Sequence, residues 1–183
     1  MRKRIAVVRA PEDVDRVSFV ADLLASSRDA DVFVTEPDPR RATAIVCGGA
    51  AQPAGIVLAT YSVEEHVMWD EPIDGPVHSM FAFFRPPDGL AHDAFVERYR
   101  AHADLARVHH PGIRRYVQDL VVEQSGEERW TFAAISELHF AGPDSYSADF
   151  YRDDESRDVI ARDVVRFSDG PSAKMIVAVR VER

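Results

Sequence analysis

The chain contains only one cysteine, Cys47, in 183 residues. A single cysteine can form no disulfide within the chain and gives no cysteine framework for a metal, so we expect a cytoplasmic protein. Positive charge is also scarce, because 22 lysine and arginine residues stand against 31 aspartate and glutamate residues, a formal net charge of −9. Such a chain is not attracted to phosphate backbones or anionic lipid, so we expect neither a nucleic acid nor a membrane as partner.

Long apolar runs and phosphate-binding loops are missing too. Ile5 to Val8 is too short for the core of an export signal, and Arg9 ends it, so the sequence predicts no signal peptide and no membrane span. Cys47 to Ala50 contains two glycines but neither the spacing nor the lysine of a nucleotide-binding loop. The apolar residues that are present, 46% of the chain, suffice for one ordinary domain or two small ones.

The first half of the chain has the pattern of a strand, a helix and further strands. The apolar run from Ile5 to Val8 predicts a strand, and Pro11 followed by two acids predicts the start of a helix that lasts to about Ala25. Ser62 is expected to begin a short helix that ends near Trp69. The apolar stripe of the first helix is expected at Val14, Val17, Ala21 and Leu24. Three more strands are expected, over residues 31–35, 43–47 and 55–60.

The second half repeats this pattern with clearer signals. The stretch from Asp70 to Pro76, rich in proline and acids, predicts a junction before it. Strands are predicted over residues 78–85, 114–122, 130–140 and 174–181. A helix is predicted from His92 to about Val108, and a helical region in one or two pieces precedes the last strand.

This order, βαββαβ, is typical of a ferredoxin-like unit with an antiparallel sheet, two helices on one face and a bare opposite face. We predict an α+β fold in which such a unit, residues 77–183, pairs with a shortened βαββ-like unit, residues 1–76, as an α+β barrel that forms a pseudo-dimer within one chain. The first unit lacks a clear final strand, so completion of an edge by a second chain, in a homodimer, stays open.

Several short motifs between about residues 79 and 180 resemble the EthD-domain proteins of the dimeric α+β barrel superfamily. They are, in chain order, Phe83 to Phe95, Tyr99 to Ala103, Pro111 to Gln118 and Ser136 to Phe140. The resemblance implies a barrel formed by facing sheets, with a pocket beneath the helices. The superfamily includes cofactor-independent monooxygenases, polyketide cyclases, lactone isomerases and haem enzymes, so the reaction type stays open.

His102 is the first catalytic candidate. It shares one helical stripe with Phe95, Tyr99 and Ala106, so its imidazole faces the apolar side of the helix. An imidazole in that position can move a proton in either direction, as acid/base chemistry on a carbonyl or phenolic substrate requires. The alternative is a histidine of the core whose ring is bonded to a backbone carbonyl.

Glu137 and His139 are the second catalytic candidates. They alternate along a strand with Leu138 and Phe140, and because the apolar pair belongs beneath the helices, Glu137 and His139 should face the barrel interior. A carboxylate and an imidazole on one strand face can share a proton, and burial is expected to raise the glutamate pKa. The alternative is a buried pair that only satisfies itself.

Four polar side chains are predicted to bind the substrate. Tyr116 and Gln118 lie on one side of a neighbouring strand, Tyr99 lies on the helical stripe, and His78 begins the first strand of the second half. We expect no metal, because the adjacent His109 and His110 point in different directions and lack a third ligand. We expect no other cofactor, and we interpret Cys47 as an inert buried thiol.

Two hypotheses for the function follow. The first is a small cofactor-independent enzyme of bacterial secondary metabolism that acts by histidine acid/base chemistry on a hydrophobic carbonyl or aromatic, polyketide-like molecule, as a cyclase, isomerase, decarboxylase or monooxygenase. The second is a non-catalytic binding or assembly module with a packed barrel interior. A cavity that reaches His102 or His139 favours the enzyme, and a solid interior favours the module.

Overall fold

The computed structural model describes residues 2–36, 43–49 and 53–182. In chain order the helices and strands are β1 (Arg2–Arg9), α1 (Arg16–Ser26), β2 (Ala30–Thr35), β3 (Ala44–Gly48), β4 (Ile56–Asp70), β5 (Val77–Phe84), α2 (His92–His109), β6 (Ile113–Gly126), η1 (Glu128–Trp130), β7 (Ala134–Ala141), α3 (Pro143–Ser147), α4 (Asp154–Val164), η2 (Gly170–Ser172) and β8 (Lys174–Arg180). None of these helices is long and apolar enough to cross a membrane.

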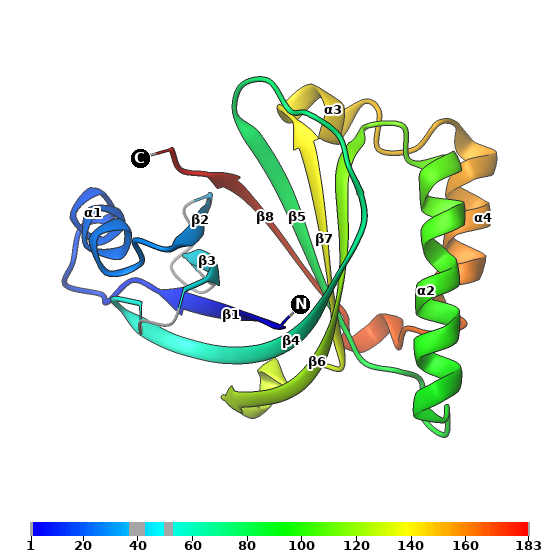
Figure 1. Cartoon of the computed structure of the whole chain (residues 1–183), viewed down its shortest axis with the longest axis horizontal. Coiled ribbons are helices and arrows are strands. Elements are labelled where there is room, and N and C mark those ends of the chain that lie inside the picture. The colour runs from blue at the N-terminus through cyan, green and yellow to red at the C-terminus, as the bar shows by residue number, and fades with distance from the viewer. Residues whose placement is uncertain (1, 37–42, 50–52, 183) are drawn as a thin grey trace.

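The strands close into an antiparallel barrel in the order β1-β3-β2-β8-β5-β7-β6-β4, with β4 pairing back to β1. Two ladders, β2 with β8 and β4 with β6, join the first half of the chain to the second. Helices α2 and α4 lie side by side against one side of the barrel and α1 lies at the opposite side (Figure 1). The predicted α+β barrel is confirmed, and the two halves meet edge to edge within one chain.

Each half has the strand order of a ferredoxin-like unit. The second half runs β8-β5-β7-β6 and the first runs β4-β1-β3-β2. The final strand that the sequence left unclear is therefore β4, and the first half instead lacks a second helix among the described residues. The predicted short helix from Ser62 to Trp69 is wrong, because this segment continues β4 and pairs with β1 on one edge and β6 on the other. Whether residue 76 is a domain boundary stays a prediction.

Helix α1 differs from its prediction in start and in buried face. It begins at Arg16, and the Asp15 side chain caps it by accepting bonds from the Val17 and Ser18 amides. Its buried residues are Phe19 and Leu23. The predicted stripe is wrong at Val17, which is 79% exposed, and at Ala21, whereas Val14 and Leu24 are partly buried against the core. The aromatic Phe19 buries more apolar area than a valine does, and this decides which face turns to the sheet.

Helix α2 agrees with its prediction. Phe95, Tyr99, His102 and Ala106 are all buried on the face that packs against the sheet. Two apolar clusters fill the space between the sheet and helices α2, α3 and α4. The predicted helical region near residues 143–167 forms the two separate helices α3 and α4. These layers place the His102 imidazole between helix and sheet.

The barrel interior holds a separate, largely aromatic core. It contains Phe33, Tyr61, Phe81, Phe83, Trp130 and Phe132. Trp130 lies in a 3₁₀ helix and Phe132 lies before β7, so the predicted strand from Trp130 onward starts too early.

Candidate functional site

The candidate site residues fall on opposite faces of the sheet. Glu137 and His139 point into the barrel, as predicted, because Glu137 contacts Lys3 and Cys47 of the first half. Their neighbours Ser136 and Leu138 line a cavity beneath the helices together with His102. Strand β7 thus separates two sites: His102 and Tyr116 line the cavity beneath the helices, and Glu137 and His139 line a cavity inside the barrel.

The cavity on the helix side has a volume of about 180 Å³ and lies between the sheet and helices α2 and α4. Its walls are mostly apolar, with side chains such as Phe84, Leu138, Ile160 and Phe167. Small-molecule sites usually measure roughly 300–1,000 Å³. At about 180 Å³ the cavity is smaller than this range, so it suits only a small hydrophobic molecule. We refer to it as the helix-side pocket.

His102 in this pocket is held by an aspartate from another helix. Its Nδ1 lies 2.9 Å from Oδ2 of Asp163 on α4, and Nε2 has no hydrogen-bond partner among the described residues. Burial lowers the pKa of His102, and the bond to Asp163 opposes that shift only in part. The ring is thus neutral near pH 7, with Nδ1–H donating a hydrogen bond to Asp163 and the Nε2 lone pair available.

Asp163 is itself fixed in place. Its Oδ1 accepts a hydrogen bond of 3.0 Å from Arg166, and its side chain is 11% exposed. This residue was missed by the sequence interpretation, although it is on the same helical face as Ile160, which is buried in α4. The helical spacing could have marked it as inward, but only the packing of α4 on α2 shows its pairing with His102.

Tyr99, Tyr116 and Gln118 form a buried hydrogen-bond network on the helix side of the sheet. The Tyr99 hydroxyl donates to the Ile135 carbonyl at 3.0 Å, and Nε2 of Gln118 donates to the Tyr99 carbonyl at 2.6 Å. The Ser136 and Tyr116 hydroxyls lie 3.3 Å apart, and both line the pocket. Burial raises the pKa of both tyrosines, so their hydroxyls stay protonated. Tyr99 and Gln118 lie behind the pocket wall.

Of the histidines His78, His109 and His110, only His110 lines the helix-side pocket. His110 lines the helix-side pocket, bonds the Phe150 carbonyl through Nδ1, and has a pKa lowered by burial to about 4. His109 bonds Ser156 at 2.9 Å and points elsewhere, as predicted. His78 is half-buried and belongs to neither the helix-side pocket nor the cavity inside the barrel. The sequence thus singled out His78, which lies apart, and did not predict that His110 lines the pocket.

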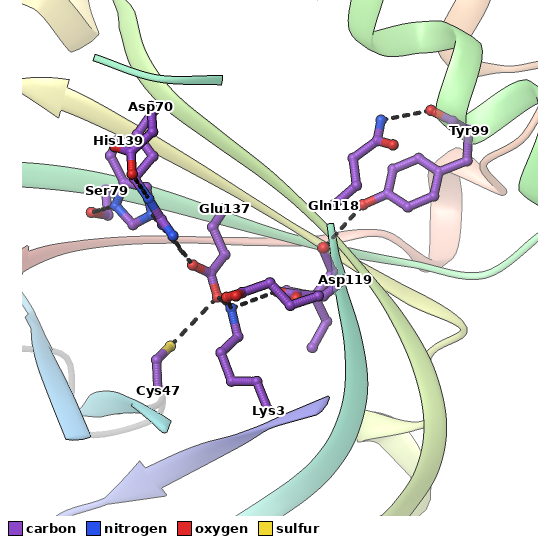
Figure 2. A network of polar contacts seen from close by, with 12 residues as sticks. Lys3, Cys47, Asp70, Ser79, Tyr99, Gln118, Asp119, Glu137 and His139 are labelled. Atoms are coloured by element: carbon purple, nitrogen blue, oxygen red, sulfur yellow. Dashed lines mark hydrogen bonds and ion pairs between the residues drawn. The ribbon is translucent and has the colours of Figure 1, made fainter. Parts of the chain in front are cut away.

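The second site is a cluster of charges inside the barrel. The Lys3 ammonium lies 2.6 Å from Glu65, 2.9 Å from Glu137 and 3.3 Å from Asp119. Figure 2 shows Lys3, Glu137 and Asp119 converging from three strands, with Cys47 beside them. Neither oxygen of Asp119, which is wholly buried, has a hydrogen bond from the described residues. We call Lys3, Glu65, Asp119 and Glu137 the barrel cluster.

His139 extends this cluster toward the open end of the barrel. Its Nδ1 lies 2.7 Å from the Ser79 hydroxyl and its Nε2 lies 3.3 Å from Glu137. Arg115 approaches both, at 3.2 Å from His139 and 3.7 Å from Glu137. Every polar atom of His139 is thus bonded within the protein. This arrangement matches the alternative expectation of a pair that satisfies itself more closely than that of a free acid/base pair.

The pKa values of the two buried carboxyl groups, Glu137 and Asp119, are shifted in opposite directions. Burial raises the pKa of Glu137, but the bond to His139 and the Lys3 ammonium outweigh burial and hold its pKa below the usual range. The expected upward shift for Glu137 is therefore wrong. Burial and the neighbouring Glu137 charge raise the pKa of Asp119 to about 9. Burial lowers the pKa of Lys3, but Glu137 and Asp119 outweigh it and raise the pKa.

The open end of the barrel encloses a cavity of about 550 Å³. Lys3, Glu137 and His139 form its floor and Arg115 and Asp70 lie near its rim. Lys3 and Asp119 were not among the predicted site residues. Strand alternation could have found them, because Lys3 shares its strand face with the inward Ile5 and Val7. We call this cavity the barrel mouth.

Cys47 lines the barrel mouth but is almost fully buried, 3.6 Å from Glu137. Burial and the Glu137 charge raise the pKa of its thiol well above the usual value. A thiol in this state is a poor nucleophile, which agrees with its interpretation as inert.

Fold and pockets define the class of protein. An eight-stranded antiparallel barrel built from two ferredoxin-like halves, with a pocket beneath its helices, is a fold of the dimeric α+β barrel type. Residues 87–171 match the EthD domain family, which confirms the resemblance over that stretch of the second half. No curated protein sequence matches the chain.

Solved structures of the same fold cover nearly the whole chain. An anthrone oxidase-like protein is similar with a TM-score of 0.68 and 12% identity over 99% of this chain and 91% of its own. A proposed monooxygenase from Fusobacterium nucleatum matches with a TM-score of 0.63 and 10% identity over 99% of this chain and 92% of its own. A major regulator of staphylococcal pathogenesis matches with a TM-score of 0.59 and 11% identity, and the match covers 100% of both chains. At these identities the similarity establishes the fold alone.

Proposed function

We propose that the protein is a small cofactor-independent enzyme that uses His102 as a general base on a hydrophobic carbonyl or aromatic molecule bound in the helix-side pocket. The observation that carries this proposal is the His102–Asp163 pair, with Nδ1 held at 2.9 Å and Nε2 unpartnered among the described residues at the wall of an apolar cavity. Asp163 fixes the tautomer and stabilises the imidazolium that forms when Nε2 takes a proton.

The pocket also offers groups that stabilise the product of this proton transfer. The Tyr116 and Ser136 hydroxyls line the wall contributed by the sheet and can donate to a carbonyl oxygen that gains negative charge. Gln118 donates to the Tyr116 hydroxyl at 3.2 Å, which leaves the hydroxyl proton of Tyr116 for Ser136 or for the substrate. In this proposal Tyr116 and Ser136 contact the substrate, and Tyr99 and Gln118 position them.

Proton abstraction next to a carbonyl is the shared first step of isomerisation, cyclisation and oxygenation of such compounds. The names of two structural neighbours, an anthrone oxidase-like protein and a proposed monooxygenase, fit a substrate whose C–H bond is made acidic by a carbonyl and aromatic rings. The volume of about 180 Å³ limits the substrate to a compact skeleton of two or three fused rings.

Hydrogen–deuterium exchange tests the proton abstraction without knowledge of the final product. The protein is incubated in D₂O with 2-tetralone and with anthrone, and loss of the acidic C–H signal is followed by proton NMR. We expect catalysed exchange that falls by about 10²-fold or more in His102→Gln. Because the His102 pKa is lowered, exchange should persist below pH 6.5. The exposed His92 lies on the same helix, so His92→Gln is the matched control and should exchange normally.

Two results would contradict the proposal. The first is equal exchange in His102→Gln and the wild type while circular dichroism shows both folded. The second is no exchange by the wild type above the buffer rate with either compound. Saturable binding without exchange would favour the alternative of a non-catalytic binding module, which the packed aromatic part of the barrel interior also fits.

A further inference from the structure

His110 is a polar residue of the helix-side pocket to which the proposed proton transfer gives no role. It directly follows the last residue of α2, lines the pocket together with His102, and is 4% exposed. In the proposed function His102 takes the proton, and the hydroxyls of Tyr116 and Ser136 bind the carbonyl oxygen of the substrate. What His110 adds depends on which of its ring nitrogens the protein already uses.

The protein uses only Nδ1 of His110. This nitrogen is hydrogen-bonded to the Phe150 carbonyl. A carbonyl oxygen can only accept a hydrogen bond, so Nδ1 carries the proton and donates it. Burial lowers the pKa of the ring to about 4, so near pH 7 the ring holds no second proton and Nε2 keeps its lone pair. Nε2 has no hydrogen-bond partner in the part of the chain that the structure describes.

The imidazole of His110 is held in this orientation by two aromatic neighbours. Its ring centroid lies 4.6 Å from that of Phe150 and 4.9 Å from that of Tyr151, and both rings also line the pocket. Because Nδ1 is turned to the Phe150 carbonyl, Nε2 is the polar atom that the ring can present to a molecule in the pocket. A purely structural role explains the bond through Nδ1 but leaves a buried acceptor unused, and buried acceptors in folded proteins almost always have a donor.

The partner of Nε2 has to be an uncharged donor. None of the described residues that line the helix-side pocket is acidic or basic other than its two histidines, so an ammonium group would enter it without a counter-ion. A hydroxyl group can donate to Nε2 without bringing a charge into the cavity. The aromatic rings of Phe150 and Tyr151 beside Nε2 suit a hydroxyl carried on an aromatic ring.

The two imidazoles are far enough apart to bind different ends of one molecule. His102 and His110 are eight residues apart, which corresponds to about 12 Å along a helix axis. From this geometry we infer that the substrate of the helix-side pocket carries a phenolic hydroxyl that donates to Nε2 of His110, at the end away from the C–H bond that His102 deprotonates. The inference rests on the proposed function and narrows its substrate class to phenolic carbonyl compounds.

His110 is then a specificity-determining residue. A methyl ether of the same skeleton has no proton to give, so its binding would leave Nε2 buried without a hydrogen bond. Sites built to bind a substrate hydroxyl reject analogues that lack it, because the buried partner in the protein stays unpaired.

Calorimetric titration at pH 7 with three naphthalene compounds tests the inference. 2-Naphthol has the hydroxyl, 2-methoxynaphthalene has the oxygen without its proton, and naphthalene has neither the oxygen nor its volume, which controls for steric exclusion of the ether. None of them has a C–H bond next to a carbonyl, so binding is measured apart from proton abstraction. We expect 2-naphthol to bind at least about tenfold more tightly than the other two. His110→Phe keeps an aromatic ring without the acceptor and should abolish this preference.

Two control variants should keep the preference for 2-naphthol. His92→Phe makes the same substitution at an exposed position at the start of α2. His102→Gln removes the other imidazole of the pocket and tests whether that ring is the acceptor.

Nitrogen-15 NMR of the wild type supplies a measurement that needs no variant to fold. Saturation with 2-naphthol should shift the resonance of the unprotonated Nε2 of His110, while Nδ1 keeps its proton. Naphthalene should leave the Nε2 resonance in place.

The inference is overturned if 2-naphthol binds no more tightly than naphthalene, if folded His110→Phe retains the preference, or if the Nε2 resonance of His110 does not move at saturation. Loss of the preference in His102→Gln alone would assign the hydroxyl to His102 and overturn it as well. The proposed function fails separately, because it is tested by exchange of 2-tetralone, which has no hydroxyl. A preference for 2-naphthol that requires His110 would still support the assignment of the hydroxyl site if that exchange were absent.

Discussion

The protonated carboxyl of Asp119 should give the stability of the protein a distinctive pH dependence. Burial and the Glu137 charge raise its pKa to about 9 in the folded state, whereas an aspartate in an unfolded chain has a pKa of about 3.9. Between about pH 5 and 8 the folded protein thus binds one proton more than the unfolded chain at this residue. Its contribution to the free energy of unfolding therefore falls by about 1.4 kcal/mol for each unit of pH increase.

Asp119→Asn removes this proton while keeping the shape of the side chain. The difference between wild type and variant isolates Asp119 from His102 and His110, whose lowered pKa values make stability rise with pH up to about 6.5 in both proteins. Glu137, with a lowered pKa, loses its contribution only as the pH falls below about 4.5. The variant should gain up to about 4 kcal/mol relative to the wild type between pH 5 and 8.

Urea unfolding at half-unit steps of pH measures this difference. The exposed Glu123 on the same strand supplies the control, and Glu123→Gln should give a curve parallel to the wild type. If the Asp119→Asn curve is also parallel to the wild type, Asp119 is ionised in the folded protein and the description of the barrel cluster is wrong.

Three further predictions test other parts of the structure. Lys3→Met keeps the packing of the aliphatic side chain but leaves buried carboxylates without their ammonium. It should lower the free energy of unfolding, measured by urea titration at pH 7, by about 3–5 kcal/mol. A loss below about 1 kcal/mol would contradict this. Gly126→Ala places a Cβ 2.3 Å from the Leu58 carbonyl at a φ of +128°, so thermal unfolding should show a loss of at least about 1–3 kcal/mol. Asp15→Ala removes the cap of α1 and should cost about 0.5–2 kcal/mol, with faster amide exchange in the first turn as its signature and an unchanged first turn as the contrary result.

The second half of the chain could be predicted well because its elements carry strong local signals. The stripe of Phe95, Tyr99, His102 and Ala106 has helical spacing and is buried as a unit. Alternation along β7 placed Glu137 inward and Leu138 toward the helices, as the structure does. Periodicity is a property of the local sequence, so it identifies elements and faces before any packing is known.

The first half was harder to predict because its local signals conflict with tertiary pairing. Ser62 and the acids that follow it resemble a helix start, yet the segment lies in β4 between two antiparallel partners. The hydrogen bonds of those two ladders outweigh a weak helical preference. In α1, a three-to-four spacing that includes Val17 also exists, but the bulk of Phe19 determines the buried face.

The sequence by itself determined the identity of most elements, the inward direction of Glu137 and His139, and the placement of His102 on an apolar helix face. Only the tertiary structure decided which groups meet. Asp163 reaches His102 because α4 packs on α2, and Lys3 reaches Glu137 because the barrel closes. Both pairs join residues more than sixty positions apart in the chain. Local spacing carries no information about such distances, because they are set by the curvature and closure of the whole sheet.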